Sequence, residues 1–499
     1  MLALATTVAR PAIAAEPAEV APADTTDRAF RYTHGAKKDY LRATLQEGLV
    51  LAGGLVEYAL DTDNGEDQNL GYTWRDFRGK LVFDTVSFDN NRFGTNWLSH
   101  PGAGFLFYQA ARSNRLSVLE SFAISFATAT LWELVAELRE KVAANDMIVT
   151  PISGFALGEA CLQLGSFFQR SRAGAMGGFV FAPLKSVNDA LDGASPLPAS
   201  RVDDLGLDDE GWHRFVVGGG AGVTQQRDGR TWSDGRVDAR TRIVTLPGYG
   251  REGRHGGAFV AGDVSSLHLS ATTSAGRLVD LDVGGAVIPA GWYMQDTHID
   301  ERGRLRGHGV LGGLVVDAEY SHHEWARVDG GPPNLIANVD AGLGFEHALY
   351  AGPLVLRTTA DALLAFAGVE SFALAAYRRA HGDEGLTSVL ARWGYHHAAG
   401  ASLRPRLEVT AGAFDASASM RIDLFRSIKG FDVEGTVGTR GEVVPTDSRT
   451  IARATLGASP SGHVRLHVDA ERRTRAGQTG DVTESATERS FFGGVDLVF

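Results

Sequence analysis

The sequence predicts a membrane β-barrel of about twelve antiparallel strands that follows a region of α-helices. From about residue 212 to residue 499, apolar and polar residues alternate with the period of two that is typical of strands. Residues 39–175 instead show apolar residues at helical spacing. No run of about 18 or more apolar residues is free of charge, so we expect any membrane crossing to be made by strands.

Composition narrows the function classes. The chain has 499 residues and a formal net charge of −12, which argues against a nucleic-acid-binding surface because such a surface needs a basic face. With 44% hydrophobic residues the chain can bury a core and is not disordered. Cys161 is the single cysteine, so an intrachain disulfide is excluded. The length suggests two or three units or one large barrel.

The pattern divides the chain into five segments. Residues 1–15 have a short apolar stretch and a small-x-small site at Ala12 and Ala14, which predicts the remnant of a signal peptide; the alternative is a disordered Ala-rich terminus. Residues 16–34 have the composition of a linker. We expect a helical plug or cap over residues 35–175, a connecting segment over 176–211, and the transmembrane barrel over 212–499.

Helix start signals recur in the first half. Pro101 follows His100 at a position where the missing N–H of proline costs nothing, which predicts a helix to about Arg112. Ser117 and Glu120 form a capping box, and the helix that they open is predicted to run to about Lys141. Thr150-Pro151 predicts a third helix start. Gly154 and Gly158 leave a strip without side chains, where another helix could approach closely.

The strands have one apolar and one often charged face. In His463–Glu471, Val464, Leu466, Val468 and Ala470 alternate with His463, Arg465, His467, Asp469 and Glu471. The same alternation is present in 237–245, 279–283, 354–366, 407–413 and 416–424. A soluble β-sandwich would explain this pattern, and so would a barrel with lipid outside and a polar lumen.

The end of the chain favours the barrel. Phe491, Gly493, Val495, Leu497 and Phe499 share one face, and the final residue is aromatic. This strand resembles the C-terminal signature strand of bacterial outer-membrane barrels, which their insertion machinery reads. The resemblance implies insertion through Phe499, contact with outer-membrane lipid, and a place in the outer membrane of a Gram-negative bacterium.

The candidate site is a set of polar residues among apolar ones: His100, Glu133, Glu137, Asp146 and Glu159. Glu133 and Glu137 are four apart and share a helix face. Buried carboxylates must be protonated, paired or bound to a cation, so these residues could act as acid, base or ligands. The alternative is a hydrogen-bonded network that fastens the helices to the barrel. The sequence lacks the HExxH zinc pattern. No metal or cofactor can therefore be assigned to these residues.

Two histidine pairs fall within predicted strands, His322-His323 and His396-His397. Neighbouring residues of a strand point to opposite faces, so each pair can offer one imidazole to the lumen. The run Gly218–Gly220 is not a phosphate loop, because no Lys-Ser/Thr follows it. Glycines there allow the strand to bend or another backbone to approach closely.

Residues 96–193 resemble a bacterial family, domain of unknown function 3943. The resemblance is carried by Asn96, His100-Pro101, Gly104, Tyr108, Ala111-Arg112, Glu120-Ser121, Trp132-Glu133, Glu137, Asn145-Asp146, Thr150, Gly154, Gly158-Glu159, Pro183, Asn188 and Asp192-Gly193. The chain departs from the family at Leu138–Ala144, where the family usually has Pro-Ser before Asn-Asp. The resemblance implies an outer-membrane-associated protein and no particular activity.

Three functions fit the sequence. The first is a structural or transport barrel whose helical plug governs binding or passage of a small or amphiphilic molecule. The second is a membrane-embedded enzyme that acts on lipid or lipopolysaccharide through His100 and the carboxylates. The third is a soluble periplasmic β-rich binding protein. The identity of the ligand is not encoded in any motif of the sequence.

Overall fold

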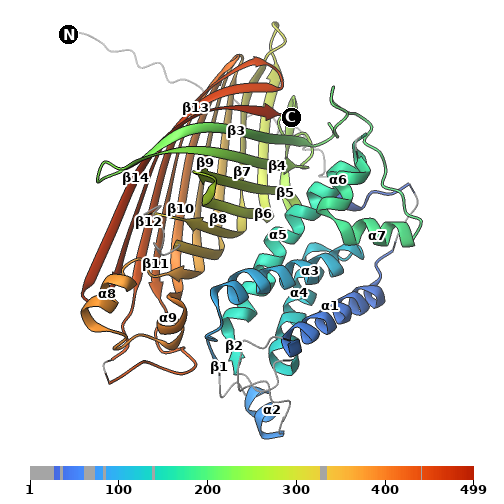
Figure 1. The fold of residues 1–499 in the computed structure, drawn as a ribbon. Helices are drawn as coiled ribbons and strands as arrows, with labels where there is room; N and C mark the ends of the chain where they lie inside the picture. The colour runs from blue at the N-terminus through green and yellow to red at the C-terminus, as the bar shows by residue number, and fades with distance from the viewer. Residues whose placement is uncertain are drawn as a thin grey trace, which may run out of the picture.

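The computed structural model describes residues 27–33, 37–60, 74–81, 86–136, 141–172, 174–325, 334–439 and 441–499. The predicted signal-peptide remnant, residues 1–15, and most of the predicted linker lie outside this range. Within it, twelve antiparallel strands close into a barrel in the order β10-β11-β12-β13-β14-β3-β4-β5-β6-β7-β8-β9 (Figure 1). The predicted barrel and its approximate strand number are confirmed.

The barrel strands are long, and neighbours in sequence pair with one another. Their bounds are β3 Trp212–Gln226, β4 Thr231–Val244, β5 Gly253–Ser274, β6 Arg277–Ile299, β7 Leu305–His323, β8 Asn334–Ala351, β9 Leu354–Glu370, β10 Tyr395–Ala411, β11 Phe414–Ser427, β12 Thr446–Ser461, β13 Val464–Thr479 and β14 Val482–Val498. β14 pairs with β3 from Val498↔Val216 to Glu488↔Gln226, which closes the cylinder. Closure satisfies the backbone groups of both edges.

The helices precede the barrel. They are α1 Tyr40–Leu60, α2 Trp74–Leu81, α3 His100–Ser113, α4 Val118–Leu131, α5 Ala144–Arg170, α6 Gly174–Phe181 and α7 Pro183–Leu191, with one π-helical turn at Thr95–Ser99 and another at Trp132–Ala136. A short parallel pair joins β1 Val86–Ser87 to β2 Val142–Ala143. Two more helices, α8 Leu374–His381 and α9 Ser388–Trp393, lie between β9 and β10.

The start of α5 corrects one prediction. Thr150-Pro151 was expected to open this helix, but the helix begins at Ala144 and Pro151 lies inside it. Asp146 is in the first turn, where its negative charge suits the exposed N–H groups. The predicted capping box of Ser117 and Glu120 is confirmed at the start of α4. By length and composition, the helical segments Val118–Val135 and Ala144–Arg170 could each cross a membrane, which the sequence criterion had missed because it tolerated no charge.

Alternate residues of each barrel strand face the lumen and the outer surface. On β13, Leu466 and Val468 are exposed on the outer surface, while Asp469, Glu471 and Arg473 are buried in the lumen. The first histidine pair is likewise divided between the two faces: His323 bonds to lumenal carboxylates, and its neighbour His322 lies on the other face of β7. The predicted division of residues between the two faces is therefore confirmed.

The two ends of the barrel differ. At one end β3 begins, β14 ends, and β8–β9, β10–β11 and β12–β13 are joined by two-residue turns. We call this the terminal end. At the other end, residues 371–394 carry α8 and α9 and residues 428–445 form a second long connection; we call this the loop end (Figure 1). The three longest connections of the barrel therefore lie at the loop end, although β5–β6 and β13–β14 are joined there by two-residue turns. Longer loops at one end are typical of outer-membrane barrels.

The helices lie beside the barrel and not inside it (Figure 1). Helix α5 contacts β5, β6, β7 and β8. Its Val149 and Phe155 pack with Val316 and Ala318 of β7, whereas the intervening Asp317 forms an ion pair with Arg404 in the lumen. Because alternate residues of a strand face opposite sides, the contact with α5 is on the outer wall. The prediction that the helices plug the lumen is wrong for the described residues.

Candidate functional site

Charged side chains cross the lumen and fill one part of it. Arg473 of β13 donates to Asp280 of β6 (Nη1–Oδ1 2.6 Å), although β14, β3, β4 and β5 separate these strands. His323 of β7 meets Glu488 of β14 at 3.0 Å. These pairs occupy the space in which a helical plug was expected. They give the physical reason for its absence from the lumen, because the charged wall is neutralised by its own side chains.

A second set of pairs lies at the neighbouring level of the lumen. Arg421 of β11 pairs with Glu319 of β7 and with Asp423 at 2.8 Å. Arg404 donates to Asp340 at 2.6 Å, and Arg449 donates to Ser321 at 2.8 Å. Removing one partner of such a buried pair strongly destabilises the folded protein, because the other charge is left uncompensated.

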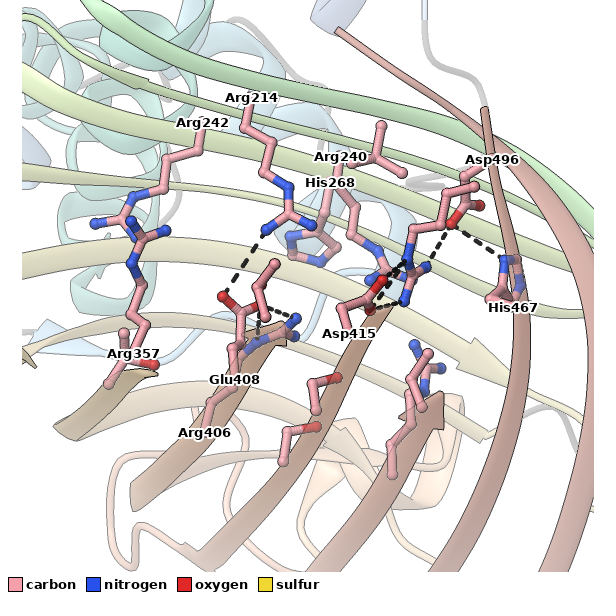
Figure 2. A pocket seen from close by; sticks show the side chains of 18 of the residues that line it. Arg214, Arg240, Arg242, His268, Arg357, Arg406, Glu408, Asp415, His467 and Asp496 are labelled. Atoms are coloured by element: carbon pink, nitrogen blue, oxygen red, sulfur yellow. Dashed lines mark hydrogen bonds and ion pairs between the residues drawn. The ribbon is translucent and has the colours of Figure 1, made fainter. Parts of the chain in front are cut away.

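A cavity of about 320 Å³ lies on the terminal side of these pairs (Figure 2). Its lining holds seven arginines, Arg214, Arg240, Arg242, Arg357, Arg406, Arg453 and Arg465. It holds four carboxylates, Glu408, Asp415, Asp469 and Asp496, together with His268 and His467. The lining side chains thus include more arginines than carboxylates, while Glu346, Glu471 and Asp238 behind the lining pair with Arg242, Arg453 and Arg240.

Two arginines of this cavity are weakly paired. The guanidinium of Arg214 lies 3.8 Å from Glu408, and that of Arg240 lies 3.5 Å from Asp238. Their side chains are 41% and 42% exposed, so both reach into the open space. Arg465 is bound closely by Asp415 and Asp496, at 2.5 and 2.7 Å. Arg214 and Arg240 are thus the groups that retain most capacity to bind an added anion.

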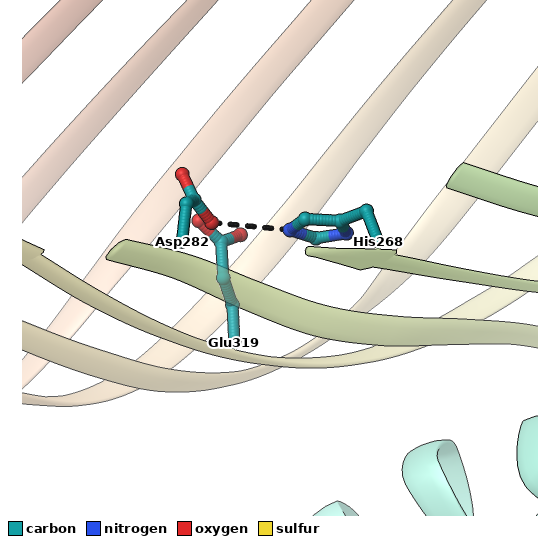
Figure 3. Close-up of side chains that lie close together, drawn as sticks. All are labelled: His268, Asp282 and Glu319. Atoms are coloured by element: carbon teal, nitrogen blue, oxygen red, sulfur yellow. Dashed lines mark hydrogen bonds and ion pairs between the residues drawn. The ribbon is translucent and has the colours of Figure 1, made fainter. Parts of the chain in front are cut away.

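The wall beside the cavity carries a group of possible metal ligands. Among the described residues, His268 of β5, Asp282 of β6 and Glu319 of β7 place their ligand atoms within 4.8 Å of one another (Figure 3). His268 Nε2 lies 3.1 Å from Asp282 Oδ1. Glu319 already pairs with Arg421 and lies 3.6 Å from Arg404. Since guanidinium groups neutralise this carboxylate, we interpret the group as part of the lumenal ion-pair network.

The structure brings two of the predicted site residues together. His100 Nε2 lies 3.6 Å from Asp146 Oδ2, and Asn145 donates to Asp146 Oδ1 at 2.8 Å. Asn145 also donates to Asp89 Oδ1 at 3.0 Å. This cluster joins the starts of α3 and α5 near Tyr395, the first residue of β10. It is a buried polar group at the loop end of the helices.

Of the two glutamates predicted to share a helix face, Glu133 is described by the structure and Glu137 is not. Glu133 is buried, and its Oε2 accepts the backbone N–H of Ala143 at 3.0 Å. Lys80 donates to the Glu133 carbonyl at 2.8 Å. Glu133 therefore ties the end of α4 to β2. Glu137 lies outside the described residues, so the predicted pairing of the two glutamates stays a prediction.

Glu159 belongs to a separate cluster on α5. It accepts hydrogen bonds from Tyr108 at 2.8 Å, from Arg112 Nε at 2.8 Å and from Gln163 at 2.7 Å. Arg112 also pairs with Asp27 at 2.5 Å. Thirteen residues of helix separate Glu159 from Asp146, a rise of about 20 Å, so one continuous site cannot include both. The prediction of a single cluster is therefore wrong for these two residues.

The alternation of residues along each strand did not predict the arginine cavity. The alternation already placed Arg465 with Asp469, and Arg357 with Asp361, on the inner face of their strands. The excess of arginine at one level of the lumen depends on the register of β3, β4, β10 and β13. That register was not part of the sequence pattern.

Comparison with known proteins gives a family for the helical part. Residues 85–184 match the domain of unknown function DUF3943. The resemblance inferred from the sequence is thereby confirmed. The DUF3943 segment contains α3, α4, α5 and α6, so both buried clusters and most of the contact with the outer wall belong to it. A search of curated proteins finds no match to the sequence.

Solved structures similar to the barrel are outer-membrane proteins. OmpT, an outer membrane protein of Vibrio cholerae, is 7% identical and covers 58% of this chain and 98% of its own, with a TM-score of 0.23. The β domain of the Bordetella autotransporter BrkA is 13% identical, with 58% and 100% covered and a TM-score of 0.23. The translocator domain of the Neisseria meningitidis autotransporter NalP is 10% identical, with 57% and 88% covered and a TM-score of 0.22.

Proposed function

We propose that the protein is an outer-membrane barrel that binds small anionic molecules in the arginine cavity of its lumen. The observation that carries this proposal is the excess of seven arginines over four carboxylates around a space of about 320 Å³. Guanidinium groups bind carboxylates and phosphates through two parallel hydrogen bonds. A cavity of this size suits a small molecule and not a macromolecule.

The ion pairs in the lumen favour binding of an anion over its free diffusion through the barrel. The ion pairs of Arg473, Arg421 and Arg404 close the lumen on the loop side of the cavity. An anion in the cavity would therefore exchange through the terminal end, which faces the periplasm in outer-membrane barrels because their short turns lie there. Release toward the loop end would require the ion pairs to rearrange.

Calorimetric titration of the refolded protein in detergent micelles tests this proposal, with inorganic phosphate and succinate as probes. Arg214→Met combined with Arg240→Met should weaken binding roughly 10²- to 10⁴-fold, because each of the two charged hydrogen bonds contributes about 1.5–3 kcal/mol. The matched control is Arg254→Met, which changes an exposed arginine that does not line the cavity. Equal affinity of the double variant and the control, or no binding by the parent protein, would refute the proposal.

A second function is supported by His100 and Asp146. A histidine 3.6 Å from a buried carboxylate is an arrangement that can act as a general base. Its place at the helix–barrel interface suits a lipid or lipopolysaccharide substrate. The described contacts give His100 no hydroxyl or thiol partner, so this enzyme hypothesis ranks below anion binding. The soluble alternative is not retained, because the closed barrel exposes Leu343, Leu364 and Leu456 on its outer wall.

A further inference from the structure

The helices beside the barrel have inverted polarity. On α4, the exposed positions are Leu119, Ala123, Phe126, Ala127 and Leu131, while the hydroxyl-bearing residues Ser121, Ser125 and Thr128 are buried. A helix that covers a water-soluble core shows the opposite pattern, with apolar residues inside and polar residues outside. Leu119 is 63% exposed, so the neighbouring helices leave most of its side chain uncovered.

Helix α1 repeats this inversion independently. Over residues 40–56, whose side chains are described, every exposed position is uncharged. Leu41, Leu45 and Leu49 are more than half exposed, whereas Glu47 is buried toward the bundle. Exposed apolar patches of this extent mark contact with a partner or with a membrane.

Helix α5 runs along the wall from one end of the barrel to the other. Its start is joined to the loop end, because Asn145 bonds to Asp89 and the neighbouring Asn90 receives a hydrogen bond from Trp393. Its last turns lie at the terminal end, where the ring of Phe167 is 5.0 Å from that of Phe215. Twenty-seven residues give a length of about 40 Å, which exceeds the thickness of about 30 Å of a hydrocarbon layer.

We propose that α1, α3, α4 and α5 form an intramembrane bundle on the outside of the barrel, and that lipid acyl chains cover the exposed faces of α1 and α4. The barrel and α5 share the same length of wall, so a membrane around one must reach the other. Arg112 and Glu159 obey the same rule, since they face the interior of the bundle and satisfy each other, while Glu120 near the start of α4 pairs with Lys38 at a more exposed position. The apolar surface of the bundle continues the apolar outer wall of the strands, on which Leu364 is 76% exposed.

Spin-label accessibility tests this placement on the full-length protein in phosphatidylethanolamine–phosphatidylglycerol vesicles. Cys161→Ser removes the native thiol, and Leu49→Cys and Phe126→Cys then carry single labels. Leu364→Cys on β9 provides the lipid reference, and Ala380→Cys on the exposed side of α8 provides the aqueous reference. We expect labels at 49 and 126 to be accessible to oxygen and shielded from a water-soluble nickel complex, as at 364.

Two results would overturn the proposal. Access to the nickel complex at 49 and 126 equal to that at 380 would place the bundle in water. Low access to both reagents, with dipolar broadening between labels, would show that a second copy covers the face. Heat-modifiable migration of each variant verifies that the barrel has inserted. If Phe126→Cys fails this check, Ala123→Cys on the same exposed face replaces it. The outcome is independent of anion binding in the lumen.

Discussion

Arg112 Nε of α3 lies 2.8 Å from Glu159 Oε2 of α5, and both side chains are fully buried. Glu159 also accepts the hydroxyl of Tyr108 and the amide of Gln163. The second guanidinium nitrogen of Arg112 meets Asp27. This pair fastens α3 to α5 within the DUF3943 segment.

Removing one member of this pair should destabilise the helices strongly. Glu159→Ala leaves the buried Arg112 charge with Asp27 as its acidic partner among the described residues, and loss of one member of a buried pair costs about 3–5 kcal/mol. Thermal unfolding followed by circular dichroism at the helix band measures this loss. Arg112→Met combined with Glu159→Met should recover most of the stability, because both fully buried charges are removed and Asp27, which is 31% exposed, can be solvated. Glu301→Ala in an exposed turn serves as the control. An additive double variant would contradict the interpretation.

The close contact of α3 and α5 predicts a difference between two glycines of the same helix. A Cβ added at Gly104 would lie 1.8 Å from the carbonyl oxygen of Thr150, whereas one added at Gly102 would meet nothing within 4 Å. Gly104→Ala should therefore cost about 1–3 kcal/mol by forcing the helices apart. Gly102→Ala should be neutral or stabilising by up to about 1 kcal/mol, because alanine favours a helix. Equal midpoints of thermal unfolding for the two variants would show that the helices do not touch at Gly104.

The lumenal ion pairs predict low conductance for the parent barrel. Arg421→Ala combined with Arg473→Ala removes two groups that reach across the lumen to Glu319 and Asp280. Single-channel conductance in planar bilayers should rise several-fold in this variant. Arg254→Ala, a change at an exposed arginine, should leave conductance unchanged. If the parent already conducts as a wide pore, the lumen is not closed by these pairs.

The enzyme hypothesis predicts a chemical phenotype for His100. His100→Ala should abolish any change that the protein makes to the lipid profile of the membrane, while heat-modifiable migration shows that the barrel still inserts. Asp146→Asn keeps the shape of the partner and removes its charge, so it should reduce the same change by a smaller factor. Identical lipid profiles for parent, His100→Ala and vector-only cells would confine the pair to a structural role.

An ion pair at the end of α7 predicts that the stability of the protein depends on pH in the acid range. Hydrogen bonds from Arg42, aided by Arg115, lower the pKa of Asp192 to about 2. An unfolded aspartate has a pKa of about 3.9, so the folded carboxylate stabilises the protein above that value and loses this contribution as the pH falls to about 2. Asp192→Asn should lower the thermal midpoint at pH 7, and the difference from the parent should shrink between about pH 4 and about pH 2. A difference that does not change with pH would exclude this contribution.

Part of the candidate site followed from sequence and part did not. The proximity of His100 to the start of α5 was predictable, because both sit where polar residues interrupt apolar helices. Glu159 was grouped with them on the same ground, yet the rise of the helix places it about 20 Å from Asp146. The glycine strip of α5 was predicted to admit a helix, and α3 occupies it at Gly104.

The sequence by itself determined which residues of each strand face the lumen, because side chains alternate across a strand whatever its neighbours are. It also determined that the helices carry polar groups among apolar ones. Only the tertiary structure decided the side of the wall on which the helices pack and where the arginines gather. Those features depend on which distant strands the closed barrel brings together, as with Arg473 and Asp280, whose ion pair occupies space in the lumen that a helix would need.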